Sequence, residues 1–182
     1  MMKKLEIGSG PNPVPGYEHL DVDSSFPHLE YVCDVSKDRL PIEDNSYDEV
    51  LMSHVIEHIP WRKLPHVAKE ILRVLKPGGC LLVRTPNLRF IVDRYLNGDI
   101  TPEWPGDEQA MRECFGVLGS AQWANIKLFS GQDYPSNFHY NCFDRKSIEQ
   151  FFKHQGFKEV LDHHWPREIS PGELQVKAVK GI

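Results

Sequence analysis

Short apolar runs separated by turns fill the first half of the chain. Five of them have the length of β-strands: residues 3–7, 17–22, 29–35, 47–55 and 80–86. The run at 47–55 is mostly apolar, as expected for a strand buried on both faces. Before the last run, apolar residues recur at helical spacing: Leu64, Val67, Ala68, Ile71, Leu72 and Leu75. Pro65 suits the first turn of this helix, and the sequence KPGG at 76–79 ends it.

The pattern loosens between residues 87 and 141 and then becomes regular again. Helices are predicted at about 88–97 and about 107–118, in a stretch too long for a simple connecting loop. We therefore expect an insertion over one edge of the sheet. Asp144 is a good N-cap for a helix that ends at Gly156, and strands are predicted at 157–164 and 173–180. The short link between these two strands predicts a hairpin, so the last strand should run antiparallel.

This alternation of strands and helices predicts an α/β fold with a mainly parallel sheet. At 182 residues the chain most simply forms one domain, spanning residues 1–182. A net charge of −5 argues against a general nucleic-acid binder, which needs clustered Lys and Arg. The four scattered cysteines are typical of reduced thiols, and no signal peptide or membrane-length apolar run is evident, so we expect a cytoplasmic protein.

A glycine turn follows the first predicted strand. Gly8-Ser9-Gly10 resembles the start of a dinucleotide-binding turn, but the third glycine of that motif is absent and no P-loop lysine follows. Prolines stand instead at positions 11, 13 and 15, and they lack the N–H groups that a helix N-terminus offers to a phosphate. The turn is therefore poorly suited to a pyrophosphate. S-adenosylmethionine, a nucleoside without phosphate, fits it better.

Acidic residues follow the next two predicted strands. Asp21 or Asp23 ends the second strand, where a carboxylate can accept hydrogen bonds from both ribose hydroxyls. Asp34 ends the third strand, on the side expected for the adenine. Because the carboxyl ends of parallel strands meet at one edge of the sheet, these acids and the glycine turn should lie together.

Several ordered segments together resemble the class I S-adenosylmethionine-dependent methyltransferases, in particular their small stand-alone members. They are LEIGSG, HLDVD, CDV, LPIEDNSYDEVLMSHVIEHI, ILRVLKPGGCLLVRTPN and HYNCFDRKSIEQFFKHQGF. The resemblance implies a Rossmann-like sheet of seven mostly parallel strands, one antiparallel, with helices on both faces. It implies S-adenosylmethionine as cofactor, with the following binding residues: Glu6, Gly8, Ser9, Gly10, Asp21 (or Asp23), Asp34, Val35 and Ser53. The family's first helix is the departure, since only about ten residues join the first two strands.

Residues 54–58, HVIEH, match the H-x-x-E-H signature of a class of zinc peptidases. Two histidines four residues apart can share a metal when they stand on one helix. Here His54 directly follows a strand and Pro60 follows soon after His58, which leaves little room for that helix. We therefore expect a polar strand end that leads into a short turn, and no metal site.

Methyl transfer to an alcohol needs a base near the acceptor hydroxyl. The candidates are His54, Glu57, His58 and His139, with His54 and His139 favoured because both should lie near the cofactor edge. The sequence thus predicts a methyltransferase for a small-molecule acceptor, with the insertion at about 87–141 as a substrate lid. The acidic and aromatic character of the insertion argues against RNA or DNA as acceptor, and no membrane partner is expected. The alternative is a module that binds S-adenosylmethionine without catalysis.

Overall fold

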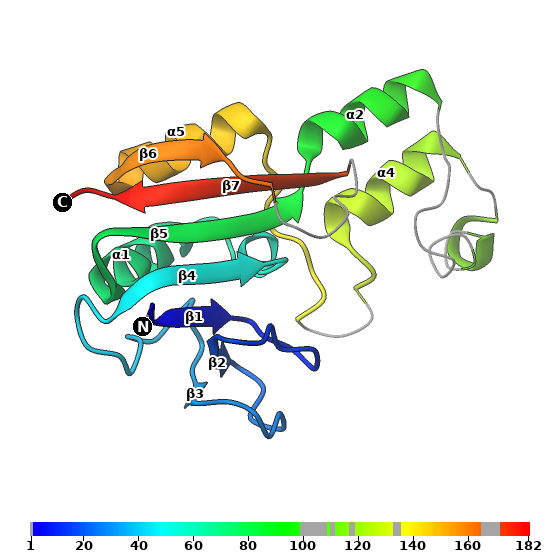
Figure 1. Cartoon of the computed structure of the whole chain (residues 1–182). Coiled ribbons are helices and arrows are strands. Elements are labelled where there is room, and N and C mark those ends of the chain that lie inside the picture. The colour runs from blue at the N-terminus through cyan, green and yellow to red at the C-terminus, as the bar shows by residue number, and fades with distance from the viewer. Residues whose placement is uncertain (1, 99–108, 110–111, 117–118, 133–135, 165–171) are drawn as a thin grey trace.

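The computed structural model describes residues 2–98, 109, 112–116, 119–132, 136–164 and 172–182. One seven-stranded sheet has the order β3-β2-β1-β4-β5-β7-β6 (Figure 1). The strands are β1 Lys4–Ile7, β2 Glu18–Asp21, β3 Tyr31–Val32, β4 Tyr47–Ser53, β5 Leu75–Pro86, β6 Phe157–Asp162 and β7 Glu173–Lys180. β7 is antiparallel to both of its neighbours, whereas the other pairs are parallel. The predicted mostly parallel sheet with one antiparallel strand is confirmed.

In the described part of the chain, four α-helices with defined bounds accompany the sheet: α1 Leu64–Val74, α2 Leu88–Asn97, α4 Ser120–Phe129 and α5 Arg145–Gln155. α5 begins where the sequence predicts, because Asp144 and Ser147 form a capping box: the Asp144 carboxylate accepts from the Ser147 amide at 2.7 Å. α4 was not predicted. Half of the helix predicted at about 107–118 lies outside the described residues; among the described ones, residues 109 and 112–115 are helical.

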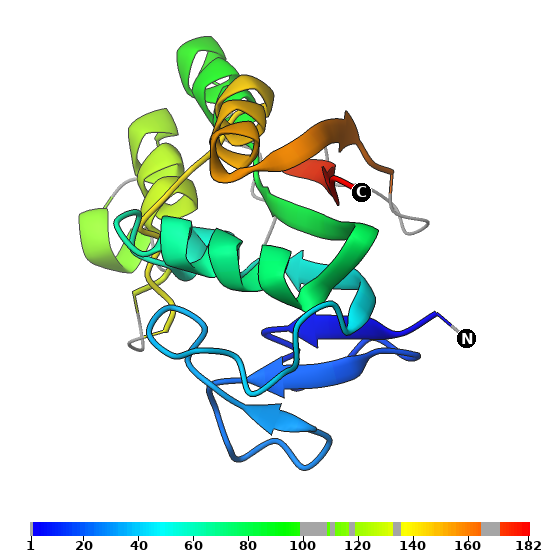
Figure 2. The ribbon, with the colours of Figure 1, turned by 90° about the vertical axis from the view of Figure 1, so that its left-hand side faces the viewer.

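The main core lies between the sheet and the helices α1 and α5, which cover the same face (Figure 2). Alternate residues of the central strands point into this core and meet the apolar stripe of each helix. Representative fully buried members are Val50, Leu81, Val176, Ile71, Ile148 and Phe152. This packing fixes the central strands, and with them the positions of their carboxyl ends.

A smaller cluster covers the opposite face of the sheet. Its buried members Leu51, Cys80 and Leu82 pack against Val14 and Tyr17 of the segment that joins β1 and β2. In the described part of the chain, this face is thus covered at that cluster by the proline-rich segment rather than by the helix expected for the family. The prolines at 11, 13 and 15 explain the replacement, because they cannot donate the hydrogen bonds of a helix.

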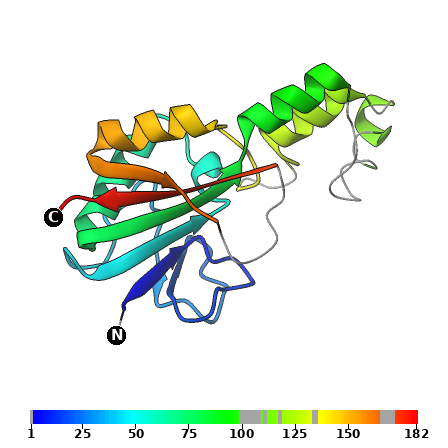
Figure 3. The same ribbon diagram turned by 45° about the horizontal axis from the view of Figure 1, so that its top comes forward.

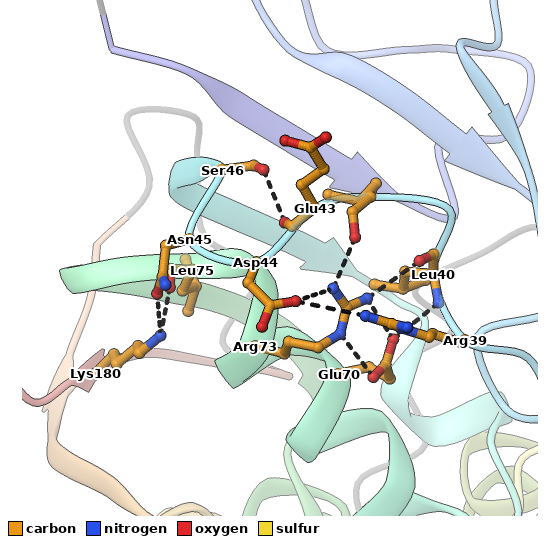
Figure 4. Close-up of polar contacts among 11 residues, drawn as sticks. Arg39, Leu40, Glu43, Asp44, Asn45, Ser46, Glu70, Arg73, Leu75 and Lys180 are labelled. Atoms are coloured by element: carbon orange, nitrogen blue, oxygen red, sulfur yellow. Dashed lines mark hydrogen bonds and ion pairs between the residues drawn. The ribbon is translucent and has the colours of Figure 1, made fainter.

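The segment between β3 and β4 is fastened to α1 by Arg73 (Figure 4). The guanidinium donates to the carbonyl oxygens of Leu40 and Ile42 at 3.1 and 2.7 Å, and to the carboxylates of Glu70 and Asp44 at 2.7 and 2.8 Å. Glu70 in turn accepts from the Leu40 amide at 2.8 Å. One half-buried arginine therefore satisfies the polar groups of a loop that has no regular structure.

α2 and α4 lie side by side beyond the carboxyl end of β5 (Figure 3). They share their own apolar cluster, built on Ile91, Trp123 and Ala124. α2 follows β5 directly and is capped by Asn87, whose side chain accepts from the Arg89 amide at 3.1 Å. α2 and α4 thus lie beyond the edge of the sheet at which the parallel strands end. Among the described residues, none of the helices has the length and apolar character needed to span a membrane.

Candidate active site

The glycine turn after β1 is tight on one side and open on the other. Gly8 and Gly10 both have positive φ, +72° and +55°. A Cβ atom on Gly8 would lie 2.5 Å from Cγ2 of Val55, whereas a Cβ on Gly10 would meet no atom within 4 Å. Gly8 is therefore required by the packing of the protein itself, and Gly10 leaves free space of the kind a bound cofactor needs.

Asp21 holds the glycine turn in place. Its buried carboxylate accepts from the Gly10 amide at 2.9 Å and from the Asp23 amide at 3.0 Å, one bond to each oxygen. Each carboxylate oxygen keeps a second lone pair for a ligand hydroxyl. The alternative acid, Asp23, is exposed, and bonds from the backbone and side chain of Ser25 hold the pKa of its carboxyl below the usual range. Asp21 thus couples the turn to the strand end expected to bind the ribose.

The side chain of Glu6, one of the predicted cofactor residues, contacts other parts of the protein. Its buried carboxylate accepts from the Val14 amide at 2.8 Å and contacts Nδ1 of His19 at 3.1 Å. These contacts anchor the proline-rich segment to β1 in place of a helix. The side chain of Glu6 therefore has a clear structural role in the part of the cofactor turn to which the resemblance assigns it.

The adenine-side residues follow β3. Val35 is buried, and Asp34 accepts from the Ser36 amide at 3.0 Å and pairs with Lys37 at 2.6 Å. Burial alone would raise the pKa of the Asp34 carboxyl, but the bonds to Lys37 and Ser36 outweigh it and lower the pKa. Because the Cys33 amide donates to the Asp21 carbonyl at 3.0 Å, Asp34 is held close to the end of β2. The predicted acids thus follow neighbouring strand ends.

Ser53 ends β4, and the backbone turns sharply at His54, which has φ +55°. Few residues other than glycine adopt this conformation, although histidine does so more often than most. The His54 amide donates to the Arg84 carbonyl of β5 at 2.8 Å, which fixes the turn. The turn places Val55 against Gly8 and His54 beside β7, so it links the cofactor turn to a neighbouring cavity.

A cavity of about 500 Å³ lies between the strand ends and the helix pair; we call it the strand-end cavity. The sheet contributes the polar side chains of Arg84 and Glu173 to it, and α2 and α4 contribute mainly apolar side chains together with Lys127. Both histidines predicted as catalytic line this one cavity, although they are 85 positions apart in the sequence. Its principal lining residues are His54, Arg84, Glu173, Ile91, Trp123 and His139.

His54 is held between two carboxylates. Its Nδ1 lies 3.1 Å from Glu57, and its Nε2 lies 3.1 Å from Glu173. Burial would lower the pKa of His54, but the bonds to Glu173 and Glu57 outweigh it and raise the pKa to about 9. The imidazole is consequently protonated at neutral pH, with both ring nitrogens donating. In this arrangement His54 organises the wall of the cavity, and it has no free nitrogen to accept a proton.

His139 has the opposite electrostatic environment. Burial lowers its pKa more than the nearby Glu57 raises it, so the ring is neutral at neutral pH. Its Nδ1 lies 3.3 Å from the Lys127 carbonyl of α4, which identifies Nδ1 as the protonated nitrogen and leaves Nε2 with a lone pair. Of the two predicted catalytic histidines, His139 is the one that can accept a proton.

Glu173 and Trp123 are among the cavity residues that were not singled out as site residues from the sequence. Glu173 is the first residue of β7. Because β7 is antiparallel, Glu173 lies where the parallel strands end, and the predicted direction of the last strand could have indicated this position. Trp123 was noted only as one of several aromatic residues. Its ring is buried, and its Nε1 has no hydrogen-bond partner in the described structure. A buried donor without a partner is rare in a folded protein.

The sheet order, the glycine turn after β1 and the acids at the ends of β2 and β3 define the class I methyltransferase fold. The methyltransferase domain family matches residues 7–162, and the chain belongs to this family. S-adenosylmethionine is the cofactor of the family, and the open side of Gly10 together with the spare lone pairs of Asp21 fits it.

Known proteins support this assignment. O-methyltransferase 3 of Dictyostelium discoideum is 32% identical over 106 residues, which cover 49% of this chain and 24% of that protein. The citrinin polyketide synthase CMeT domain has a TM-score of 0.60 at 14% identity, covering 99% of this chain and 46% of that chain. A possible histamine N-methyltransferase from Thermotoga maritima has a TM-score of 0.58 at 16% identity, covering 99% and 83%. The match to the Dictyostelium protein spans about a quarter of that protein's length.

Proposed function

We propose that the chain is an enzyme that transfers a methyl group from S-adenosylmethionine to a small molecule bound in the strand-end cavity. The observation that carries this proposal is the contact between Gly8 and Val55. Val55 packs against the cofactor turn at Gly8, and the preceding residue, His54, lines the cavity. A volume of about 500 Å³ is within the range of small-molecule sites.

When bound, S-adenosylmethionine supplies an activated methyl group, so the main task of the protein is to position the acceptor. In this proposal Gly8, Ser9 and Gly10 let the cofactor approach the backbone, Asp21 accepts from its ribose, and Asp34 with Val35 borders its adenine. Ser53 borders the methionyl end of the cofactor, and the turn at His54 leads from there to the cavity that holds the acceptor. His139 contacts the acceptor from the opposite wall, and α2 and α4 form the cover that the sequence predicted as a substrate lid.

The cofactor half of the proposal is tested by titration calorimetry with S-adenosylhomocysteine. Asp21→Ala should weaken binding by roughly 2–3 kcal/mol, because a charge-assisted pair of hydrogen bonds is lost. Asp23→Ala is the matched control, since its exposed carboxylate bonds only within its own turn in the described structure, and it should change the affinity little. The opposite ranking would move the ribose contact to Asp23. Unchanged affinity in both variants would remove it from this strand end.

The transfer half is tested by incubating the chain with radiolabelled S-adenosylmethionine and a library of hydroxyl-, amine- and carboxylate-bearing metabolites. Transfer to a compound supports the enzyme. Tight S-adenosylhomocysteine binding without turnover across the library would favour the alternative, a cofactor-binding module that regulates a partner. A labelled RNA or DNA product would contradict the small-molecule acceptor.

A further inference from the structure

A group of metal-ligating side chains lies next to the strand-end cavity. Glu57, His58 and His139 each offer a ligand atom, and the three atoms lie within 4.8 Å of one another. We propose that these three residues bind one divalent first-row transition-metal ion, such as Zn²⁺, with an open coordination position on the side of the cavity. The metal site itself does not depend on the proposed methyl transfer, although its use in catalysis rests on that function.

The cluster uses the H-x-x-E-H sequence in an unexpected way. Residues Ile56–His58 form a single 3-10 turn and not the long helix of a zinc peptidase. His54 is not a member of the cluster but contacts its Glu57, while Glu57 and His58 approach His139 from a distant part of the chain. The rings of His58 and His139 meet edge to face with their centroids 4.7 Å apart. The absence of a helix therefore excludes the peptidase arrangement without excluding a metal.

Hydrogen bonds fix which nitrogen of each histidine is available. Nδ1 of His58 lies 3.1 Å from the Phe138 carbonyl, and Nδ1 of His139 lies 3.3 Å from the Lys127 carbonyl. A carbonyl oxygen only accepts, so each Nδ1 carries the proton and each Nε2 keeps its lone pair. Histidines that bind metals commonly donate their second ring nitrogen to a carbonyl in this manner.

The third ligand is oriented by its own partners. The carboxylate of Glu57 is fully buried; one oxygen contacts His54 at 3.1 Å, and the other accepts from the Thr85 hydroxyl at 3.0 Å. Such bonds hold a carboxylate in one orientation and leave each oxygen a lone pair for a metal.

The two segments that carry the cluster are also joined through the backbone. The Tyr140 and Asn141 amides donate to the Glu57 carbonyl at 2.7 and 3.3 Å, and the Asn141 side chain donates to the Ile59 carbonyl. Ligands from distant positions are therefore held in one small region before any ion binds.

The ligand chemistry determines the class of ion. Two imidazoles and one carboxylate suit zinc and its first-row neighbours, whereas Mg²⁺ and Ca²⁺ prefer oxygen ligands. Three protein ligands are typical of sites that keep a position for water or substrate. His139 lines the strand-end cavity, so that position is accessible to an acceptor oxygen, whose pKa a metal lowers.

The test uses the full chain after removal of metals with a chelator. Zinc titration calorimetry and the visible spectrum of the Co²⁺ form should show one ion per chain. His58→Ala and His139→Ala should each weaken binding by about 100-fold or more. His154→Ala, which removes an exposed histidine of α5, is the matched control and should leave the affinity unchanged. Circular dichroism verifies that each variant is folded.

A second measurement needs no variant. X-ray absorption of the zinc-loaded wild-type chain should show two imidazole ligands. Equal zinc affinity in wild type and both cluster variants, a zinc shell without imidazole, or Mg²⁺ binding as tight as Zn²⁺ would each overturn the proposal. Because these measurements require neither cofactor nor acceptor, a negative result for the metal site does not contradict S-adenosylhomocysteine binding. Likewise, a negative result in the methyl-transfer assay does not affect the measurement of metal binding.

Discussion

The contact between Gly8 and Val55 gives a sharp test of how the cofactor turn is built. Gly8→Ala places a methyl group 2.5 Å from Val55 Cγ2, well inside an ordinary carbon–carbon contact of about 3.5–4.0 Å. Val55 is β-branched and stiff, so it cannot rotate away cheaply. The positive φ of Gly8 adds roughly 1–2 kcal/mol, and the overlap adds roughly 1–3 kcal/mol. We therefore expect Gly8→Ala to lower the free energy of unfolding by about 2–5 kcal/mol.

Gly10→Ala is the matched control for this substitution. Gly10 has a similar positive φ, but a methyl group there meets nothing within 4 Å. It should cost only the backbone term of roughly 1–2 kcal/mol. Its methyl group enters the space assigned to the cofactor, so S-adenosylhomocysteine affinity should fall. We thus expect Gly8 to be required for the packing of the protein and Gly10 to be required for cofactor binding.

Urea denaturation of four proteins completes the test: wild type, Gly8→Ala, Val55→Ala and the double variant. Removing the Val55 methyl groups should recover the overlap term, giving a coupling energy of about 1–3 kcal/mol between the two sites. The reasoning is refuted if the coupling is below about 0.5 kcal/mol, the usual scatter of additive mutations. It is equally refuted if Gly8→Ala and Gly10→Ala are destabilised to the same extent.

Three further predictions follow from individual contacts. Arg73→Met should lower the free energy of unfolding by about 2–4 kcal/mol in urea melts, because buried loop carbonyls lose their donor, whereas the exposed Arg39→Met should change it little. The bond to Arg73 lowers the pKa of Glu70, so the ionised Glu70 stabilises the folded protein above the unfolded pKa near 4.5, and this stabilisation is lost as the pH falls below it. Glu70→Gln should therefore flatten the loss of stability between about pH 5 and 3, and an unchanged slope would contradict this. Trp123→Phe deletes the unpartnered Nε1 and should raise KM for an acceptor with kcat little changed, whereas an unaltered KM would show that the acceptor does not reach the indole.

The regular elements were predictable where the apolar pattern had one period. α1 and α5 each present a single stripe to the core, β4 is a mostly apolar run, and the apolar residues of β7 largely alternate with polar ones. α4 was missed because its apolar residues, from Trp123 to Phe129, are spread around the helix and serve both α2 and the cavity. β5 begins at Leu75, earlier than predicted, because the strand continues through a Pro-Gly-Gly sequence that usually marks a loop.

In the candidate site, features that depend on one strand end were predictable, whereas contacts between residues distant in the sequence were not. The residues that border single strand ends, such as Gly10, Asp21 and Asp34, were predictable because a parallel sheet brings those ends together. The pairing of His54 with Glu173 was not, because 119 residues separate the two side chains. The sequence also identified His54 as a candidate base, and only the second carboxylate shows that both of its nitrogens are occupied.

The reversed direction of β7 explains this second carboxylate. A parallel strand brings its last residue to the cofactor edge, whereas the antiparallel β7 brings its first residue, and Glu173 pairs in register with Pro86 at the end of β5. From that position Glu173 reaches both His54 at 3.1 Å and Arg84 at 3.7 Å. The same carboxylate therefore balances two cations at the cavity wall, a task that no residue at the other end of β7 could perform. The one antiparallel strand of the fold is in this sense part of the site, because its direction places the Glu173 carboxylate at the cavity wall.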